Sequence, residues 1–114
     1  MDYKDASVPI SKVVRAAFSD ECKTFAHFAE DANAPYILIK NAGKSTIQIT
    51  VRHKTKIDAM NLCTRVGNYL KASFAIVPDV NVFDIDFQTD PTPSEGHGGS
   101  PEAWAYMDIT YFEN

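Results

Sequence analysis

Asp84 and Asp86 are the residues whose types and spacing point most directly to chemistry. They form a D-x-D pair in a run with strand character, and residues two apart on a strand share a face. Two carboxylates on one face could hold a magnesium ion, as a small metal-dependent nuclease or resolvase requires. A solvated strand face has the same pattern, and no Lys or Glu follows at a nuclease-like spacing. We therefore expect no metal and no cofactor, and keep phosphoryl transfer as the alternative hypothesis.

The histidines do not indicate a catalytic arrangement. His27, His53 and His97 are scattered along the chain, and nothing in their spacing brings a nucleophile and a base together. His97 lies in the run GHGG at residues 96–99, which is more typical of a polar loop than of a ligand. This run lacks the Lys-Ser/Thr pair and the following helix of a phosphate-binding loop. We expect no catalytic residues and no enzymatic activity.

A basic cluster of Arg52, Lys54 and Lys56 follows the second expected strand. It could bind phosphate or an acidic partner, and it is our first candidate for partner binding. The commoner role of such a cluster is that of a solubilising loop. The spacing leaves both interpretations open.

The second candidate for partner binding is the polar segment QTDPTPSEGHGGSPE at residues 88–102. Strand-like runs flank it, so it predicts a hairpin with a connection far longer than the usual 2–5 residues or so. Long connections of this kind are often functional. We expect an arm that grips a neighbouring molecule through Asp90, Thr92, Glu95 and His97.

Composition limits the classes of function. The chain has 114 residues, a net charge of −4 and a pI near 5.2, so it lacks the overall positive charge of a nucleic-acid-binding protein. Cys22 and Cys63 stand in apolar patterns without CxxC spacing, which favours small buried side chains over a disulfide or a metal site. The first residues contain no apolar run of a signal peptide, and no window is long enough to span a membrane. We expect one domain over residues 1–114 and no membrane partner.

Hydrophobic periodicity predicts the elements that position these residues. Apolar residues three and four apart indicate helices over residues 9–32 and 58–73. Asp58 is expected to cap the second helix, with Ile57 packing onto Leu62. Gly67, in the middle of that helix, suggests close packing of its backbone against the sheet. Apolar or alternating runs indicate strands over residues 35–40, 46–53, 80–88 and 103–112.

The resulting order is α-β-β-α-β-β. Two hairpins separated by a helix predict a four-stranded, mainly antiparallel sheet. Both helices must bury an apolar stripe against that sheet, so the fold class is α+β, a two-layer sandwich with both helices on one face. The other face would stay partly open, with Val80, Val82, Trp104 or Tyr106 as the residues expected on it. Its aromatic residues, together with exposed strand edges, are suited to contacts with a second chain.

The chain resembles the tail terminator (tail completion, or minor capsid) proteins of long-tailed bacteriophages. The resemblance covers essentially the whole chain and rests on PYILI at residues 35–39, IQITV at 47–51, the helix at 58–72, the strand at 80–88 and WAYMDITY at 104–111. It implies a virion protein, assembled in the host cytoplasm, that forms a ring, usually a hexamer. That ring would contact the tail tube protein and the head–tail connector. An acidic subunit is compatible with DNA passing through the lumen without binding. A host-interaction adaptor remains a further alternative.

Overall fold

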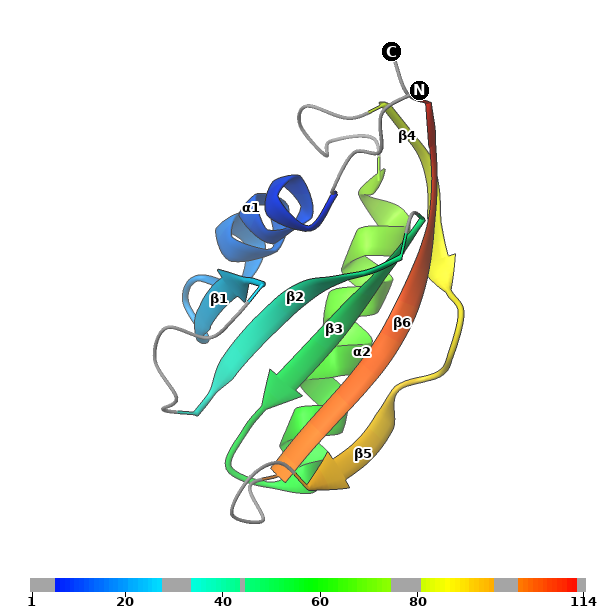
Figure 1. Cartoon of the computed structure of the whole chain (residues 1–114). Helices are drawn as coiled ribbons and strands as arrows, with labels where there is room; N and C mark the ends of the chain where they lie inside the picture. Colours follow the sequence, from blue (N-terminus) through cyan, green and yellow to red (C-terminus); the bar gives the residue numbers. More distant parts are fainter. Residues whose placement is uncertain (1–5, 28–33, 44, 75–80, 96–100, 113–114) are drawn as a thin grey trace.

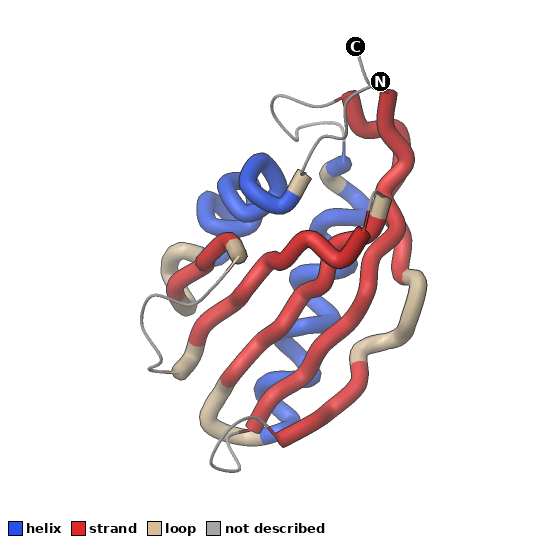
Figure 2. Tube along the Cα trace, viewed as in Figure 1, coloured by secondary structure: helices blue, strands red, loops and turns tan. Residues whose placement is uncertain are grey.

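One mixed sheet and two helices make up the structure, a computed structural model that describes residues 6–27, 34–43, 45–74, 81–95 and 101–112. The elements are shown in Figures 1 and 2 and follow the order α1 (Ser7–Phe18), β1 (Lys23–Ala26), β2 (Tyr36–Gly43), β3 (Thr46–Arg52), α2 (Lys56–Ala72), β4 (Asn81–Phe87), β5 (Thr92–Glu95) and β6 (Pro101–Phe112). The predicted α+β class is confirmed.

The sheet is larger than the sequence pattern predicted. Six strands belong to it in the described part of the chain, with the order β1-β2-β3-β6-β4, and β5 also pairs with β6. β1 runs parallel to β2, and the other pairs are antiparallel. The prediction of four strands in the order α-β-β-α-β-β is therefore wrong, because two short strands were assigned to a helix and to a loop.

The first of these strands, β1, lies within the stretch expected to continue the first helix. α1 ends at Phe18, whose carbonyl accepts hydrogen bonds from the N–H groups of Glu21 and Cys22. Asp20 and Glu21 follow after the C-cap residue Ser19, and acidic residues are unfavourable at the negative end of the helix dipole. Cys22 and Phe25 keep a helical spacing by coincidence, so periodicity alone extended the helix too far.

The second short strand, β5, lies within the segment expected to be one long connection. Thr92 pairs with Trp104 and Pro93 with Ala103, so this part of the segment lies along β6 instead of projecting from it. The N–H groups of Gln88 and Thr89 also donate to the carbonyl of Tyr106. Proline suggested a loop here, but an edge strand tolerates proline because one side of its backbone has no partner strand. His97 lies outside the described residues.

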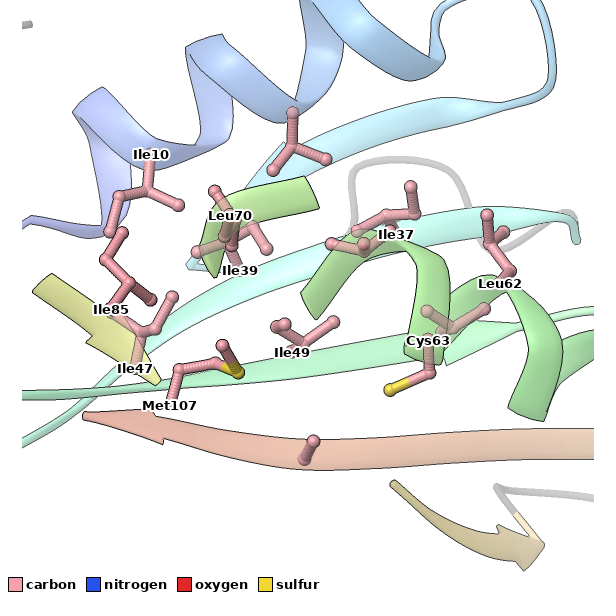
Figure 3. Packing of buried hydrophobic residues seen from close by; sticks show 14 of the residues in the cluster. Ile10, Ile37, Ile39, Ile47, Ile49, Leu62, Cys63, Leu70, Ile85 and Met107 are labelled. Carbon is pink, nitrogen blue, oxygen red and sulfur yellow. The ribbon is translucent and has the colours of Figure 1, made fainter. Parts of the chain in front are cut away.

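The core forms between the helices and one face of the sheet, as Figure 3 shows. Alternate residues of β2, β3 and β6 point into it and are almost fully buried. These sheet residues are Ile37, Ile39, Ile47, Ile49, Val51, Ala103, Ala105 and Met107. The helices complete the same cluster with Ile10, Val14, Leu62, Val66 and Leu70. Each large aliphatic side chain buried here contributes about 1.5–3 kcal/mol.

The beginning of α2 differs from its prediction. Thr55 is the N-cap, and its Oγ1 accepts a hydrogen bond from the N–H of Asp58 at 3.1 Å. Ile57 is 73% exposed and therefore does not pack onto Leu62. Both Thr and Asp are good caps, and the helix takes the earlier one. The expected cap at Asp58 was wrong by one turn.

Gly67 lies where α2 comes closest to the sheet. The ring of Phe87, on the edge strand β4, occupies the space that a Cβ at Gly67 would need. The prediction that close packing explains this glycine is confirmed. Lys71, one turn further along α2, contacts the same region, with its Nζ 5.8 Å from the centre of the Phe87 ring and 3.3 Å from Asp86 Oδ1.

Candidate interaction surface

The face of the sheet turned away from the core carries a mixture of aromatic, polar and charged side chains. In the view of Figure 1, α2 lies behind β3 and β6, and neither helix crosses the near face of these strands. We call this the open face. On β6 it presents Glu102, Trp104, Tyr106 and Asp108, which alternate with the core residues. A face of this composition can contact a partner without requiring one for solubility.

An aromatic pair lies at the centre of the open face. The rings of Trp104 and Tyr106 are 5.5 Å apart at an interplanar angle of 67°, and both side chains are half-buried. On one side, the neighbouring residues are Thr50 and Gln48 of β3. On the other side, Thr92 pairs with Trp104, and Thr89 Oγ1 accepts a hydrogen bond from the N–H of Tyr106. Half-exposed aromatic rings among short polar side chains are typical of interface anchors.

Arg52, one of the three residues of the expected basic cluster, forms an ion pair with an acidic residue. Arg52 lies directly opposite Glu102, with 3.1 Å between Nε and Oε2, and the two side chains are 16% and 18% exposed. Ser94 of β5 donates to the other carboxylate oxygen at 3.1 Å. Lys54 is exposed in the turn after β3, and Lys56 is exposed at the first residue of α2. The charge of Arg52 is therefore matched by Glu102.

The expected arm residues lie in different places. Asp90 is exposed between β4 and β5, and Thr92 lies on β5 beside the aromatic pair. Glu95 ends β5. Among these residues, Thr92 is the one that joins the open face. The sequence analysis expected Thr92 on a projecting arm, whereas the pairing of β5 with β6 places it beside Trp104.

Asp84 and Asp86 share a face of β4, as predicted, and both are exposed. A hydrogen bond from the N–H of Phe87 lowers the pKa of Asp86 below its ordinary value, and Lys71 adds to that effect. Within the described ranges there is no group of three His, Cys, Asp or Glu residues that could hold a metal ion. These two carboxylates therefore have no third potential ligand in the part of the chain that the structure describes.

The thiols are protonated at neutral pH. Burial raises the pKa of Cys22 to about 11 and that of Cys63 to about 12. Both cysteines are free, with Cys22 half-buried and Cys63 fully buried in the core. A protonated thiol is a poor nucleophile and a poor metal ligand. Their environment agrees with the prediction that they act as small apolar side chains.

The sequence analysis expected exposed strand edges but did not identify the strands that form them. β1 forms one edge, and β4 and β5 together form the other, on opposite sides of Figure 1. Beside β1 lies a hollow of about 520 Å³, which is lined by Arg15, Ser19, Cys22, Lys23, Thr24, Phe25 and Ala26. Thr24 and Phe25, a β-branched and an aromatic residue a few positions after Asp20 and Glu21, are the signal that could have revealed this strand.

The guanidinium of Arg15 holds β1 against α1. Its Nε and Nη2 donate to the carbonyl oxygen of Thr24 at 3.3 and 3.1 Å. Thr24 Oγ1 is buried and has no hydrogen-bond partner. On the opposite edge, Asp86 Oδ1 accepts a hydrogen bond from the N–H of Phe87 at 2.8 Å. A charged side chain therefore caps a backbone group on each edge strand.

None of the helices in the described part of the chain is both long and apolar enough to cross a membrane.

In comparisons with known proteins, no protein-family model matches the sequence, and no curated protein matches it either.

Proposed function

We propose that this chain is a structural subunit that assembles side by side with copies of itself, in a ring that terminates a phage tail tube. The observation that carries the proposal is the sheet with two unlike open edges. A contact between two different surfaces repeats from copy to copy, and it forms a ring if the rotation closes. The resemblance to tail terminator proteins adds the setting: a tube on one side of the ring and a head-side connector on the other.

The open face supports a second contact in the same assembly. The Trp104–Tyr106 pair is half-exposed, and a hollow of about 340 Å³ lies beside it among side chains that include Tyr36, Gln48 and Arg52. We infer that this face meets the tail tube protein or the connector. The net charge of −4 fits a lumen through which DNA passes, because an acidic wall does not retain phosphates.

Assembly is tested with the purified chain. Gel filtration with light scattering measures the mass across a range of concentrations, and negative-stain imaging shows the shape of any assembly. We expect rings of uniform size, either in solution or at the ends of added tail tubes. A chain that stays monomeric at high concentration and leaves the tube ends unoccupied would contradict the proposal.

The open-face contact needs its own measurement. Trp104→Ala combined with Tyr106→Ala should leave ring formation intact while it weakens the binding of rings to tubes. The matched control is Thr46→Ala, a substitution on the same face at the end of β3. Equal tube binding by the aromatic variant and the control would remove the open face from the proposal.

A further inference from the structure

The two edges of the sheet carry opposite charges. The basic edge consists of β1 and the flank of α1, where Lys12, Arg15 and Lys23 are exposed. Two acidic residues, Asp20 and Glu21, lie in the turn before β1. Asp20 is exposed, and the carboxylate of Glu21 is bound by Arg65 through two hydrogen bonds of 2.8 Å, so the three cations outnumber the acidic groups of this edge. The acidic edge consists of β4 and the residues after it, where Asp84, Asp86 and Asp90 are exposed. Lys71 contacts this edge through Asp86.

Two residues of the basic edge turn their backbone groups away from the sheet, where a further strand would pair. In a parallel pair, alternate residues bond to the same neighbour. The N–H of His27 donates to the carbonyl of Ile39 on β2, so Thr24 and Ala26 turn their backbone groups away from β2. The bond from Arg15 to the carbonyl of Thr24 agrees with this orientation. Every residue from 22 to 26 lines the hollow, whichever way its side chain points, so the hollow follows the edge of the backbone.

The backbone at the acidic edge has the same property. The N–H of Gln88 donates to β6, whereas the N–H of Phe87 bonds to its own neighbour, Asp86. In an antiparallel ladder, too, every second residue bonds to the neighbouring strand. Because Gln88 bonds to β6, Ile85 and Phe87 turn their backbone groups away from β6. Each edge therefore presents two residues to a further strand.

We propose that the basic edge of one copy pairs with the acidic edge of the next, so that β1 and β4 join two sheets into one. This inference rests on the proposed function and specifies its ring contact. An N–H of the incoming strand replaces the guanidinium of Arg15 at the Thr24 carbonyl. Asp86 likewise gives up the N–H of Phe87 to the neighbouring β1. The released guanidinium and carboxylate then lie across the same junction and pair.

The occupant is a second copy because the charge of its acidic edge complements that of the basic edge. β1 has four residues, so an added strand gains few backbone bonds. Such a short junction holds when opposite charges align it and when ring closure makes the last contact intramolecular. An unrelated extended peptide would gain the same backbone bonds without the acidic row of β4.

Charge reversal of each edge tests the pairing. One variant carries Lys12→Glu and Lys23→Glu, and the other carries Asp84→Lys and Asp90→Lys. Sedimentation velocity should show that each variant alone associates at least roughly tenfold more weakly than the unchanged chain, because like charges then face each other. A mixture of the two should regain association, because the unchanged acidic edge of the first variant meets the unchanged basic edge of the second. Lys40→Glu, at an exposed position on β2, is the control for the single variant Lys12→Glu, with the same charge change on a strand that forms neither edge.

The outcomes separate the junction from the proposed function. If the charge-reversed variants associate as the unchanged chain does, if the mixture fails to recover, or if the control is equally impaired, the proposed junction is wrong. The junction is also wrong if the unchanged chain does not associate. Association that depends on both edges but gives open chains without binding to tubes would contradict the tail-ring function and leave the junction standing. Lys12→Glu alone and Asp84→Lys alone replace any double variant that does not fold.

Hydrogen exchange tests the backbone pairing itself, because a change in net charge alone would not protect backbone amides from exchange. The amide hydrogens of Thr24 and Ala26 should exchange at least about tenfold more slowly in the assembly than in the monomer, since they would become bonded across the junction. An assembly that leaves both amides unprotected would also overturn the proposal.

Discussion

The two faces of the sheet follow different rules. On the helix-covered face, alternate positions of β3 are Ile47, Ile49 and Val51, and all are almost fully buried. On the open face, the residues between them are Gln48 and Thr50, both half-buried. The covered face is uniform because its one task is to exclude water. The open face is mixed. Its half-exposed aromatic pair does not serve solubility, and this makes the open face the candidate for binding a partner.

The largest effect should come from making a cavity on the covered face. Ile49→Ala removes a side chain that is completely buried in the core, so we expect the free energy of unfolding to fall by about 2–5 kcal/mol. Thr50→Ala, the next residue on the open face, should change it by less than about 1 kcal/mol. Urea denaturation of both variants measures the contrast. Similar losses for the two would show that the faces do not differ in the way described.

A second variant adds volume on the covered face instead of removing it. Gly67→Ala should gain about 1 kcal/mol from helix propensity, but its Cβ would overlap the ring of Phe87. We expect overpacking to win, with a net loss of about 1–2 kcal/mol in the free energy of unfolding. Adding Phe87→Leu should recover part of that loss, which a double-mutant cycle would detect. Stabilisation by Gly67→Ala alone would mean that Phe87 moves aside without cost.

The difference between the faces also explains how much of the fold could be predicted. α2, β3 and β6 were recognisable because each presents a regular row of apolar residues to the core. β1 and β5 have four residues each, too few to establish a period. β5 also contains Pro93, and only its position at an edge makes that proline acceptable. Short edge strands depend on tertiary pairing that local sequence does not encode.

The candidate surface was less predictable than the fold. Arg52 was expected to join Lys54 and Lys56, but strand register places it opposite Glu102, fifty residues away in the chain. Trp104 and Tyr106 were recognised as possible open-face residues because they alternate with core positions. The opposite charges of the two edges could not be inferred, since they require the order of the strands in the sheet. Contacts between distant segments therefore account for most of what the sequence analysis missed.

The ion pair between Arg52 and Glu102 tests whether the open face also stabilises the fold. The pair is less than one-fifth exposed on each side, and opposite charges on facing strands contribute about 0.2–1 kcal/mol. A double-mutant cycle with Arg52→Ala and Glu102→Ala should give a coupling energy of about 0.5–1 kcal/mol in the free energy of unfolding. A coupling energy near zero would mean that this pair does not stabilise the fold. A value of several kcal/mol would mean that the open face contributes to stability as the covered face does.

The smallest effect is expected at the outer side of the helix layer, where Arg65 binds Glu21. Their hydrogen bonds, together with the positive charge of Arg65, hold the pKa of Glu21 below its ordinary value of 4.5. A lowered pKa in the folded state stabilises the protein above the unfolded value, and this contribution is lost as the pH falls through the folded pKa. Because both side chains are about half-exposed, solvent screening limits the contribution to a few tenths of a kcal/mol or so. The wild-type protein should therefore lose this contribution as the pH falls below about 4.5, and Glu21→Gln should not show that loss. Thermal unfolding at several pH values would measure the difference. An unchanged pH profile would show that packing alone holds the turn after α1 against α2, which would make the contrast between the two faces of the sheet sharper still.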